Sequence, residues 1–264
     1  MKINKLSSFF LTYLLLLCKG FYSIKIIITL TNTTLLLDWL NTMTDEIKHY
    51  ATGAVIPLGD GFTGKSVLSR LIINPDISDE ELKNILLKTK KSYNIEIEFS
   101  SEKVEVEKLP ITATLQFYVF PGQRQKVSEK STTFDEILSV FDCFPALLRI
   151  SVLLLIYDVT RFSTLESLEI WLRFAIAKEW IYEDTLIVLI SNKVDLDKPN
   201  EKNIANVTST ILEYVHDHAL PIDINHIKAL NTSCATLEGI KELREIIIDW
   251  IATRGIRGVG IVDR

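Results

Sequence analysis

The sequence contains few cysteines and has no surplus of basic residues. The three cysteines, Cys18, Cys143 and Cys234, are odd in number, far apart and never in a C-x-x-C arrangement. A disulfide framework and a zinc site are therefore not indicated, and a reducing, cytoplasmic compartment fits best. The formal net charge of −5 gives no reason to expect binding to nucleic acid. With 264 residues, 47% of them hydrophobic, the chain can form a core of ordinary size.

Residues 1–42 differ in composition from the rest, because they lack Ala, Val, Pro, Glu, Gln, Arg and His. Their apolar runs, Leu6 to Cys18 and Ile26 to Leu37, are shorter than the ~18–20 residues that span a bilayer. A secretory signal fits poorly, because leucines precede Cys18 where a small residue is expected. The alternatives are a misassigned start upstream of Met43, a membrane anchor and a genuine soluble extension, and the first is preferred since the composition resembles translated AT-rich DNA. The expected organisation is an apolar extension over 1–42, a domain over 43–254 and a flexible tail over 255–264.

From Ala51 onward, short apolar runs alternate with amphipathic stretches. This alternation predicts an α/β fold, with a mostly parallel six-stranded sheet covered by helices on both faces. Strands are predicted at 54–58, 95–99, 112–120, 152–157, 185–191 and 226–231. Helices are predicted at 65–73, 134–144, 165–179, 204–217 and 239–252.

A glycine-rich segment joins the first predicted strand to the first predicted helix. It reads Gly59-Asp60-Gly61-Phe62-Thr63-Gly64-Lys65-Ser66 and matches G-x-x-x-x-G-K-[ST], and Val67 completes the predicted loop. Backbone N–H groups of such a loop, with the N-terminus of the following helix, bind nucleotide phosphates. Lys65 is expected to neutralise the β and γ phosphates, and Ser66 to ligate Mg²⁺. The sequence therefore predicts a three-layer P-loop NTPase fold. Pro57, which lacks a ladder donor, is expected to mark the end of the first strand.

A second motif, Asn192-Lys193-Val194-Asp195, follows a predicted strand. The Asp195 carboxylate can accept hydrogen bonds from both N1–H and the amino group of guanine, a pair of donors that adenine lacks. Asn192 can bridge the base and the phosphate loop, while the aliphatic stem of Lys193 can cover the ring. The pattern predicts GTP or GDP as the ligand.

Together these segments resemble the Ras-like small GTPases, over Ala51 to Ile251. The phosphate loop is similar to those of Rab and Ran proteins, and Val152 to Thr160 is similar to a Rab-type strand. Thr232 to Ala235 resembles the last base-contacting loop of the family. The resemblance implies nucleotide contacts from Ser233, Cys234 and Ala235, with the backbone N–H of Cys234 on the guanine carbonyl.

The second switch departs from the family pattern Asp-x-x-Gly-Gln. Val119 occupies the position of the Asp that holds a Mg²⁺-bound water, whereas Gly122 and Gln123 remain. Gly122 is expected to contact the γ phosphate through its backbone, and Gln123 to orient the attacking water as the catalytic residue. The Pro-Gly-Gln sequence resembles Rag-type and bacterial polarity GTPases, in which hydrolysis is often slow or partner-dependent.

The first switch is expected to supply a hydroxyl that ligates Mg²⁺. Thr89, the preferred candidate, and Ser92 both qualify, and spacing does not choose between them. Both switch regions are longer than a minimal member requires, and the predicted helix at 134–144 lies in the second. Longer switch regions indicate surfaces for effector and regulatory proteins.

Three functions fit this sequence. The leading one is a molecular switch that hydrolyses GTP slowly with Mg²⁺. A nucleotide-binding scaffold without useful hydrolysis is the second, and Val119 favours it. The third is a membrane-tethered GTPase similar in layout to the β subunit of the signal-recognition-particle receptor, which depends on residues 1–42.

Overall fold

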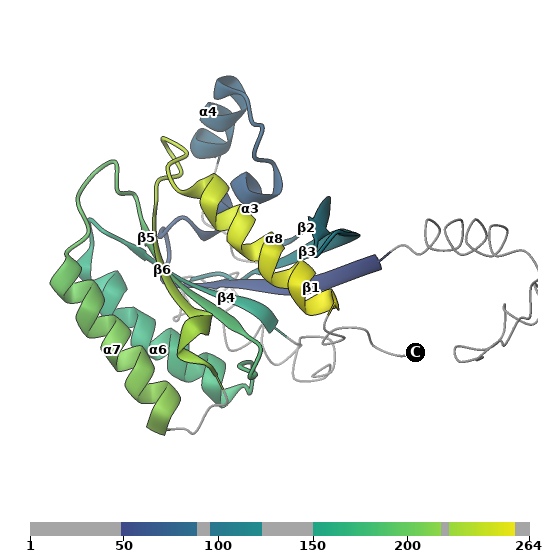
Figure 1. The fold of residues 1–264 in the computed structure, drawn as a ribbon. Coiled ribbons are helices and arrows are strands. Elements are labelled where there is room, and N and C mark those ends of the chain that lie inside the picture. Colours follow the sequence, from purple (N-terminus) through teal and green to yellow (C-terminus); the bar gives the residue numbers. More distant parts are fainter. Residues whose placement is uncertain (1–48, 89–95, 123–149, 218–221, 257–264) are drawn as a thin grey trace, which may run out of the picture. The chain divides into compact units, whose positions relative to one another are not determined.

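Six strands form one sheet in the order β2-β3-β1-β4-β5-β6 in the computed structural model (Figure 1). The structure describes residues 49–88, 96–122, 150–217 and 222–256, all of which belong to one compact unit, residues 48–264. The strands are β1 (His49–Leu58), β2 (Glu96–Val106), β3 (Leu109–Val119), β4 (Ile150–Asp158), β5 (Leu186–Asn192) and β6 (Ile227–Thr232). β2 and β3 form an antiparallel hairpin, and the other neighbouring strands are parallel. The predicted α/β fold of P-loop NTPase type is confirmed.

Two pairs of helices cover the two faces of the sheet (Figure 1). α3 (Lys65–Ile73) and α8 (Ile240–Ile256) pack on one face, and α6 (Phe162–Ala177) and α7 (Glu201–Asp217) on the other. Each face has its own apolar core, in which the strand residues are almost fully buried. The 3-10 helix η2 (Ile224–His226) precedes β6. Within the described ranges, no helix has both the length and the apolar character needed to cross a bilayer.

β1 is longer than predicted and does not end at Pro57. Pairing between β1 and β3 stops at Val55, which lies opposite Phe117, whereas pairing with β4 continues past Pro57 to Leu58. The missing N–H of Pro57 therefore disturbs no bond to β3.

The last helix also extends beyond its predicted end, from Ala252 to Ile256. Gly255, assigned to the tail from sequence, lies inside α8, where a Cβ atom would overlap the Cβ of Ala51. Glycine at this position lets the helix approach β1 closely.

One helix, α4 (Asp79–Lys88), was not predicted. Its start is a capping box, in which Glu81 N donates to Ser78 Oγ at 3.3 Å and Ser78 N donates to the Glu81 carboxylate at 3.0 Å. Leu82 is buried in the core beneath α3 and α8, and Ile85 packs against the same core. The pattern Ser78-x-x-Glu81 before apolar residues was the available sequence signal. The predicted helix at 134–144 lies outside the described residues.

Candidate nucleotide-binding site

The phosphate loop connects β1 to α3 and turns sharply at its glycines. Gly64 is the N-cap of α3 with φ of 101°, and a Cβ atom at this position would overlap the Asn192 carboxamide. Glycine is required there by both conformation and space. The helix starts at the predicted residue, Lys65, with its N-terminus directed at the end of the loop.

The Lys65 ammonium group is buried beneath this loop. Lys65 Nζ donates to Gly59 O at 2.8 Å and to Asp60 O at 2.7 Å. Burial lowers the pKa of Lys65 to about 7, against an opposing effect of Asp60, and the nearby Arg161 guanidinium lowers it further. Such a desolvated cation is stabilised by an anionic ligand, so the loop has the electrostatics of a phosphate site.

The base motif at the end of β5 is tied to the phosphate loop through Asn192. Asn192 Nδ2 donates to Thr63 O at 2.8 Å, and Asn192 Oδ1 accepts from Thr232 Oγ1 at 3.1 Å. Cys234 Sγ also donates to Asn192 Oδ1, at 3.7 Å. One carboxamide at the end of β5 thus connects the loop that follows β1 with the end of β6 and the loop after it.

The Asp195 carboxylate is oriented by Ser233, whose Oγ donates to Asp195 Oδ1 at 2.5 Å. Ser233 Oγ itself accepts from the backbone N–H groups of Ala235 and Thr236. Asp195 and Ser233 were both predicted as nucleotide contacts. The Ser233 side chain is fully buried and donates to the Asp195 carboxylate, so in this structure it orients Asp195.

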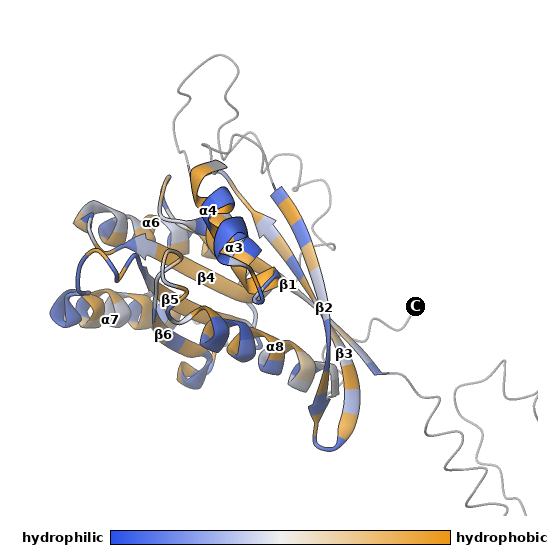
Figure 2. Ribbon diagram, turned by 90° about the horizontal axis from the view of Figure 1, so that it is seen from above, coloured by the Kyte–Doolittle hydropathy of each residue, from blue (hydrophilic) through white to orange (hydrophobic). Residues whose placement is uncertain are grey.

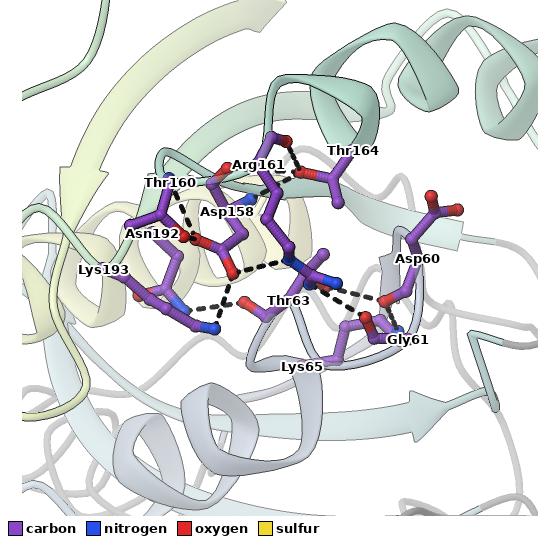
Figure 3. A network of polar contacts seen from close by, with 10 residues as sticks. All are labelled: Asp60, Gly61, Thr63, Lys65, Asp158, Thr160, Arg161, Thr164, Asn192 and Lys193. Atoms are coloured by element: carbon purple, nitrogen blue, oxygen red, sulfur yellow. Dashed lines mark hydrogen bonds and ion pairs between the residues drawn. The ribbon is translucent and has the colours of Figure 1, made fainter. Parts of the chain in front are cut away.

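Sequence reasoning missed a network centred on Asp158, at the end of β4 (Figure 3). Its carboxylate is 1% exposed and accepts from Lys193 Nζ at 2.6 Å, Arg161 Nε at 3.0 Å and Thr160 Oγ1 at 2.7 Å. Arg161 Nη2 then donates to Gly61 O at 3.0 Å. Burial raises the pKa of Asp158, but the hydrogen bonds from Lys193, Thr160 and Arg161 together lower it below its ordinary value. Asp158 therefore links the base motif to the phosphate loop.

A second missed contact supports the loop from α6. Trp171 lies in the apolar core between α6 and the sheet and is 2% exposed. In addition, Trp171 Nε1 donates to Asp60 Oδ1 at 3.0 Å. The sequence gives one indication of this contact, because the indole N–H of a buried tryptophan usually donates to a hydrogen-bond acceptor.

The second switch begins beside the phosphate loop. Val119 ends β3 with 1% exposure, in the apolar core that includes α3. Gly122 lies so close to the loop that a Cβ atom would overlap Lys65 Nζ and the backbone of Asp60 and Gly61. Gln123, Thr89 and Ser92 lie outside the described residues.

These elements line a cleft of about 320 Å³. Of the predicted site residues, the cleft is lined by Gly61, Phe62, Gly64, Lys65, Ser66, Val67, Gly122, Asn192, Lys193, Asp195, Cys234 and Ala235. Gly59, Asp60, Thr63 and Ser233 do not line the cleft but form hydrogen bonds to Lys65, Asn192 and Asp195, which do. Lining residues that sequence reasoning missed are Leu86, Phe120, Pro121 and Leu196.

The described residues of the cleft include one hydroxyl that could ligate a metal ion. Ser66, half-buried in the first turn of α3, lines the same cleft as Lys65. Within the described ranges, no cluster of three His, Cys, Asp or Glu side chains could hold a metal by itself. A hard cation bound through one hydroxyl and nucleotide phosphates fits this arrangement, because Mg²⁺ is commonly held with few protein ligands.

Comparison with protein families gives one match. Residues 145–251 match the Ras family, a range that runs from just before β4 into α8. Comparison with curated proteins gave no match. The matched range contains the base motif, Asn192 to Asp195. The phosphate loop and the second switch precede this range, so their assignment depends on the fold and on the residues that line the cleft. The family match and the six-stranded sheet together support a Ras-like small-GTPase domain.

Proposed function

We propose that this domain is a guanine-nucleotide switch that binds GTP or GDP with Mg²⁺ and hydrolyses GTP slowly. The observation that carries the proposal is the Asn192 carboxamide, which joins the base motif to Thr63 of the phosphate loop. Such a link makes recognition of the base and of the phosphates parts of one site. The oriented Asp195 carboxylate favours guanine over adenine.

Each part of the cleft has a role in this proposal. The phosphate loop and Lys65 bind the α, β and γ phosphates, and Asp195 with the backbone of Cys234 and Ala235 holds the base. Ser66 and a first-switch hydroxyl, Thr89 or Ser92, would hold Mg²⁺, which neutralises phosphate charge when bound. Gly122 contacts the γ phosphate and Gln123 orients water.

Val119 accounts for the expected slow rate. A hydrophobic residue cannot accept a hydrogen bond from a Mg²⁺-bound water, and losing such an outer contact typically costs about 10–100-fold in metal affinity or activity. Since Ras-type enzymes without an arginine finger hydrolyse at about 10⁻⁴ s⁻¹, the intrinsic rate here should be at or below that value. Partners that bind the switch regions would then control turnover.

The subfamily, the cellular location and the partners are also proposed from the sequence. Val152 to Thr160 supports a Rab-type relationship, while Pro121-Gly122-Gln123 supports a Rag-type second switch. A cytoplasmic location agrees with the three scattered cysteines. Effector and regulatory proteins are the expected partners.

A scaffold that binds GTP or GDP without useful hydrolysis is the second candidate, and buried Val119 is the observation that favours it. A membrane-tethered GTPase would depend on residues 1–42, which lie outside the described residues. Single-turnover hydrolysis of tightly bound GTP separates switch from scaffold. A slow rate that Gln123→Leu abolishes, with GTP binding intact, supports the switch, whereas no hydrolysis by the unmodified chain supports the scaffold.

The nucleotide assignment has its own test, comparing GDP and ADP affinities by fluorescence titration. Tight GDP binding and weak ADP binding are expected. Asp195→Asn should lose one charge-assisted bond, worth about 1.5–3 kcal/mol, and shift preference towards xanthine nucleotides. Equal affinity of the unmodified protein for GDP and ADP would contradict the assignment.

A further inference from the structure

A second cleft, of about 640 Å³, lies between the β2–β3 hairpin, the segment joining α3 to α4, and the first turns of α8. None of its lining residues belongs to the nucleotide cleft. Figure 2 shows the hairpin extending beside α8, with α3 and α4 along the same side of the domain. We call this site the hairpin cleft.

The floor of the hairpin cleft is apolar. Val104 and Val106 are on the inward face of β2, where the side chains are only half-buried. Ile77, before α4, is half-buried as well, whereas Ile240 and Ile248 of α8 line the cleft but are only 3% and 5% exposed. Because β2 is an edge strand, no further strand of the sheet covers this side within the described ranges. The floor therefore offers apolar side chains to an incoming segment.

The rim of the cleft carries an excess of negative charge. Its charged residues are Asp76, Glu102, Glu105, Glu245, Asp249, Lys241 and Arg244. Both cationic side chains already face a carboxylate. Arg244 forms an ion pair with Glu102, and Lys241 Nζ lies 3.9 Å from Glu245 Oε1. In the part of the chain that is described, Asp76, Glu105 and Asp249 have no cationic partner, and all three are exposed.

The helix α4 and the residues just before it connect the two clefts. Ile77, before α4, lines the hairpin cleft, and Leu86, near the end of α4, lines the nucleotide cleft. Between them, Leu82 is buried and Ile85 packs against the core. One short capped helix therefore has an end at each cleft, and a shift of α4 would alter both.

We propose that the hairpin cleft docks a basic amphipathic segment of a partner protein. Apolar side chains of that segment cover Val104, Val106 and Ile77, while its Lys or Arg side chains face the unpaired carboxylates of the rim. Docking also biases α4 and through Leu86 the nucleotide cleft. This last step rests on the proposed function, whereas the docking itself does not.

The test uses the full chain and two fluorescein-labelled helical peptides, one of Leu and Lys and one of Leu and Glu, with anisotropy as the readout. The Leu/Lys peptide should bind and the Leu/Glu peptide should not. A triple variant, Asp76→Asn, Glu105→Gln and Asp249→Asn, removes the three unpaired charges of the rim. It should bind the Leu/Lys peptide about 10-fold more weakly, because each exposed ion pair contributes roughly 0.5 kcal/mol or more.

The matched control replaces three exposed acids on the opposite face, with Glu166→Gln, Glu213→Gln and Asp217→Asn, and has the same change in net charge. It should leave the affinity almost unchanged. A floor variant, Val104→Thr, should also weaken binding while the melting temperature stays close to that of the unmodified chain. Equal effects of the two triple variants, or equal binding of the two peptides, would overturn the docking proposal.

Coupling to α4 is measured by repeating the titration with the nucleotide-free, GDP-loaded and GTPγS-loaded chain. Peptide affinity should differ between the GDP and GTPγS states, and Leu86→Ala should reduce that difference. Identical affinities in both loaded states would overturn the coupling step. If the chain binds no nucleotide, the proposed function fails, but peptide binding to the nucleotide-free chain still decides the docking proposal.

Discussion

Lys193 Nζ lies 2.6 Å from Asp158 Oδ2, and this ion pair joins the segment proposed to bind the base to the end of β4. The same carboxylate oxygen accepts from Arg161 Nε, and Arg161 continues to Gly61 O in the phosphate loop. Both ends of the nucleotide site are thus held by one buried carboxylate. Charge-assisted hydrogen bonds of this kind are short and stronger than neutral ones.

Asp158→Asn should weaken GDP binding by about 10-fold or more, because the neutral amide no longer fixes Lys193 and Arg161, and hydrogen bonds to charged groups contribute about 1.5–3 kcal/mol each. Fluorescence titration with labelled GDP measures the effect. Glu213→Gln, an exposed change on α7, is the control and should bind like the unmodified chain. Unchanged affinity in the D158N variant would show that the network does not support the site.

The lowered pKa of Asp158 also predicts a dependence of stability on pH. A carboxylate with a lowered folded-state pKa stabilises the fold above its unfolded value, here near 3.8, and that stability is lost as pH falls through the folded pKa. The difference in unfolding free energy between the unmodified chain and the D158N variant should therefore be largest near neutral pH and shrink below about pH 4. Urea titrations across this range provide the measurement, and a difference that grows on acidification would contradict it.

The contact between Trp171 and Asp60 is expected to stabilise the phosphate loop. A double-mutant cycle with Trp171→Phe and Asp60→Ala should give a coupling energy of about 1.5–3 kcal/mol in urea unfolding, the range for a hydrogen bond to a charged acceptor. Trp250→Phe is a useful comparison, because Trp250 Nε1 donates to a neutral backbone oxygen, Asp184 O. A coupling energy near zero would mean that Trp171 acts only through packing.

Sequence patterns found the parts of this site but not the contacts between them. The loop between β1 and α3 and the start of α3 at Lys65 were predicted correctly because their signals are local and specific. The link from Asp158 to Lys193 spans 35 positions and depends on β4 lying beside β5, which no local pattern encodes. The hydrogen bond from Trp171 to Asp60, 111 positions away, likewise depends on the tertiary arrangement and not on any local pattern. The capping box of α4 was a local signal that was overlooked.

Cys234 provides a prediction about reactivity. Burial raises the pKa of its thiol to about 12, and the side chain is 7% exposed. In a chain carrying Cys18→Ser and Cys143→Ser, disulfide reagents at pH 8 should modify Cys234 at least about 100-fold more slowly than a free thiol. Urea unfolding should remove the protection, and bound GDP should increase it, since Cys234 lines the cleft. Rapid modification of the folded chain would contradict this placement.

Val119→Asp tests whether the second switch can recover a conventional Mg²⁺ environment. Val119 is 1% exposed among apolar neighbours, so a carboxylate at this position should lower the free energy of unfolding by about 3 kcal/mol or more when Mg²⁺ and nucleotide are absent. If the carboxylate reaches a Mg²⁺-bound water, adding Mg²⁺ and GDP should restore more stability than it adds to the unmodified chain, because the ligand then binds the folded state more tightly.

Val119→Asn is the matched control for this change, since it buries a polar group of similar size without a negative charge. Its stability should fall, but its dependence on Mg²⁺ should remain that of the unmodified chain. Thermal melts in EDTA, in Mg²⁺ alone and in Mg²⁺ with GDP separate these cases. Equal Mg²⁺ dependence in the V119D and V119N variants would show that this position faces only the core, and slow hydrolysis would then have to be explained by the geometry of the switch itself.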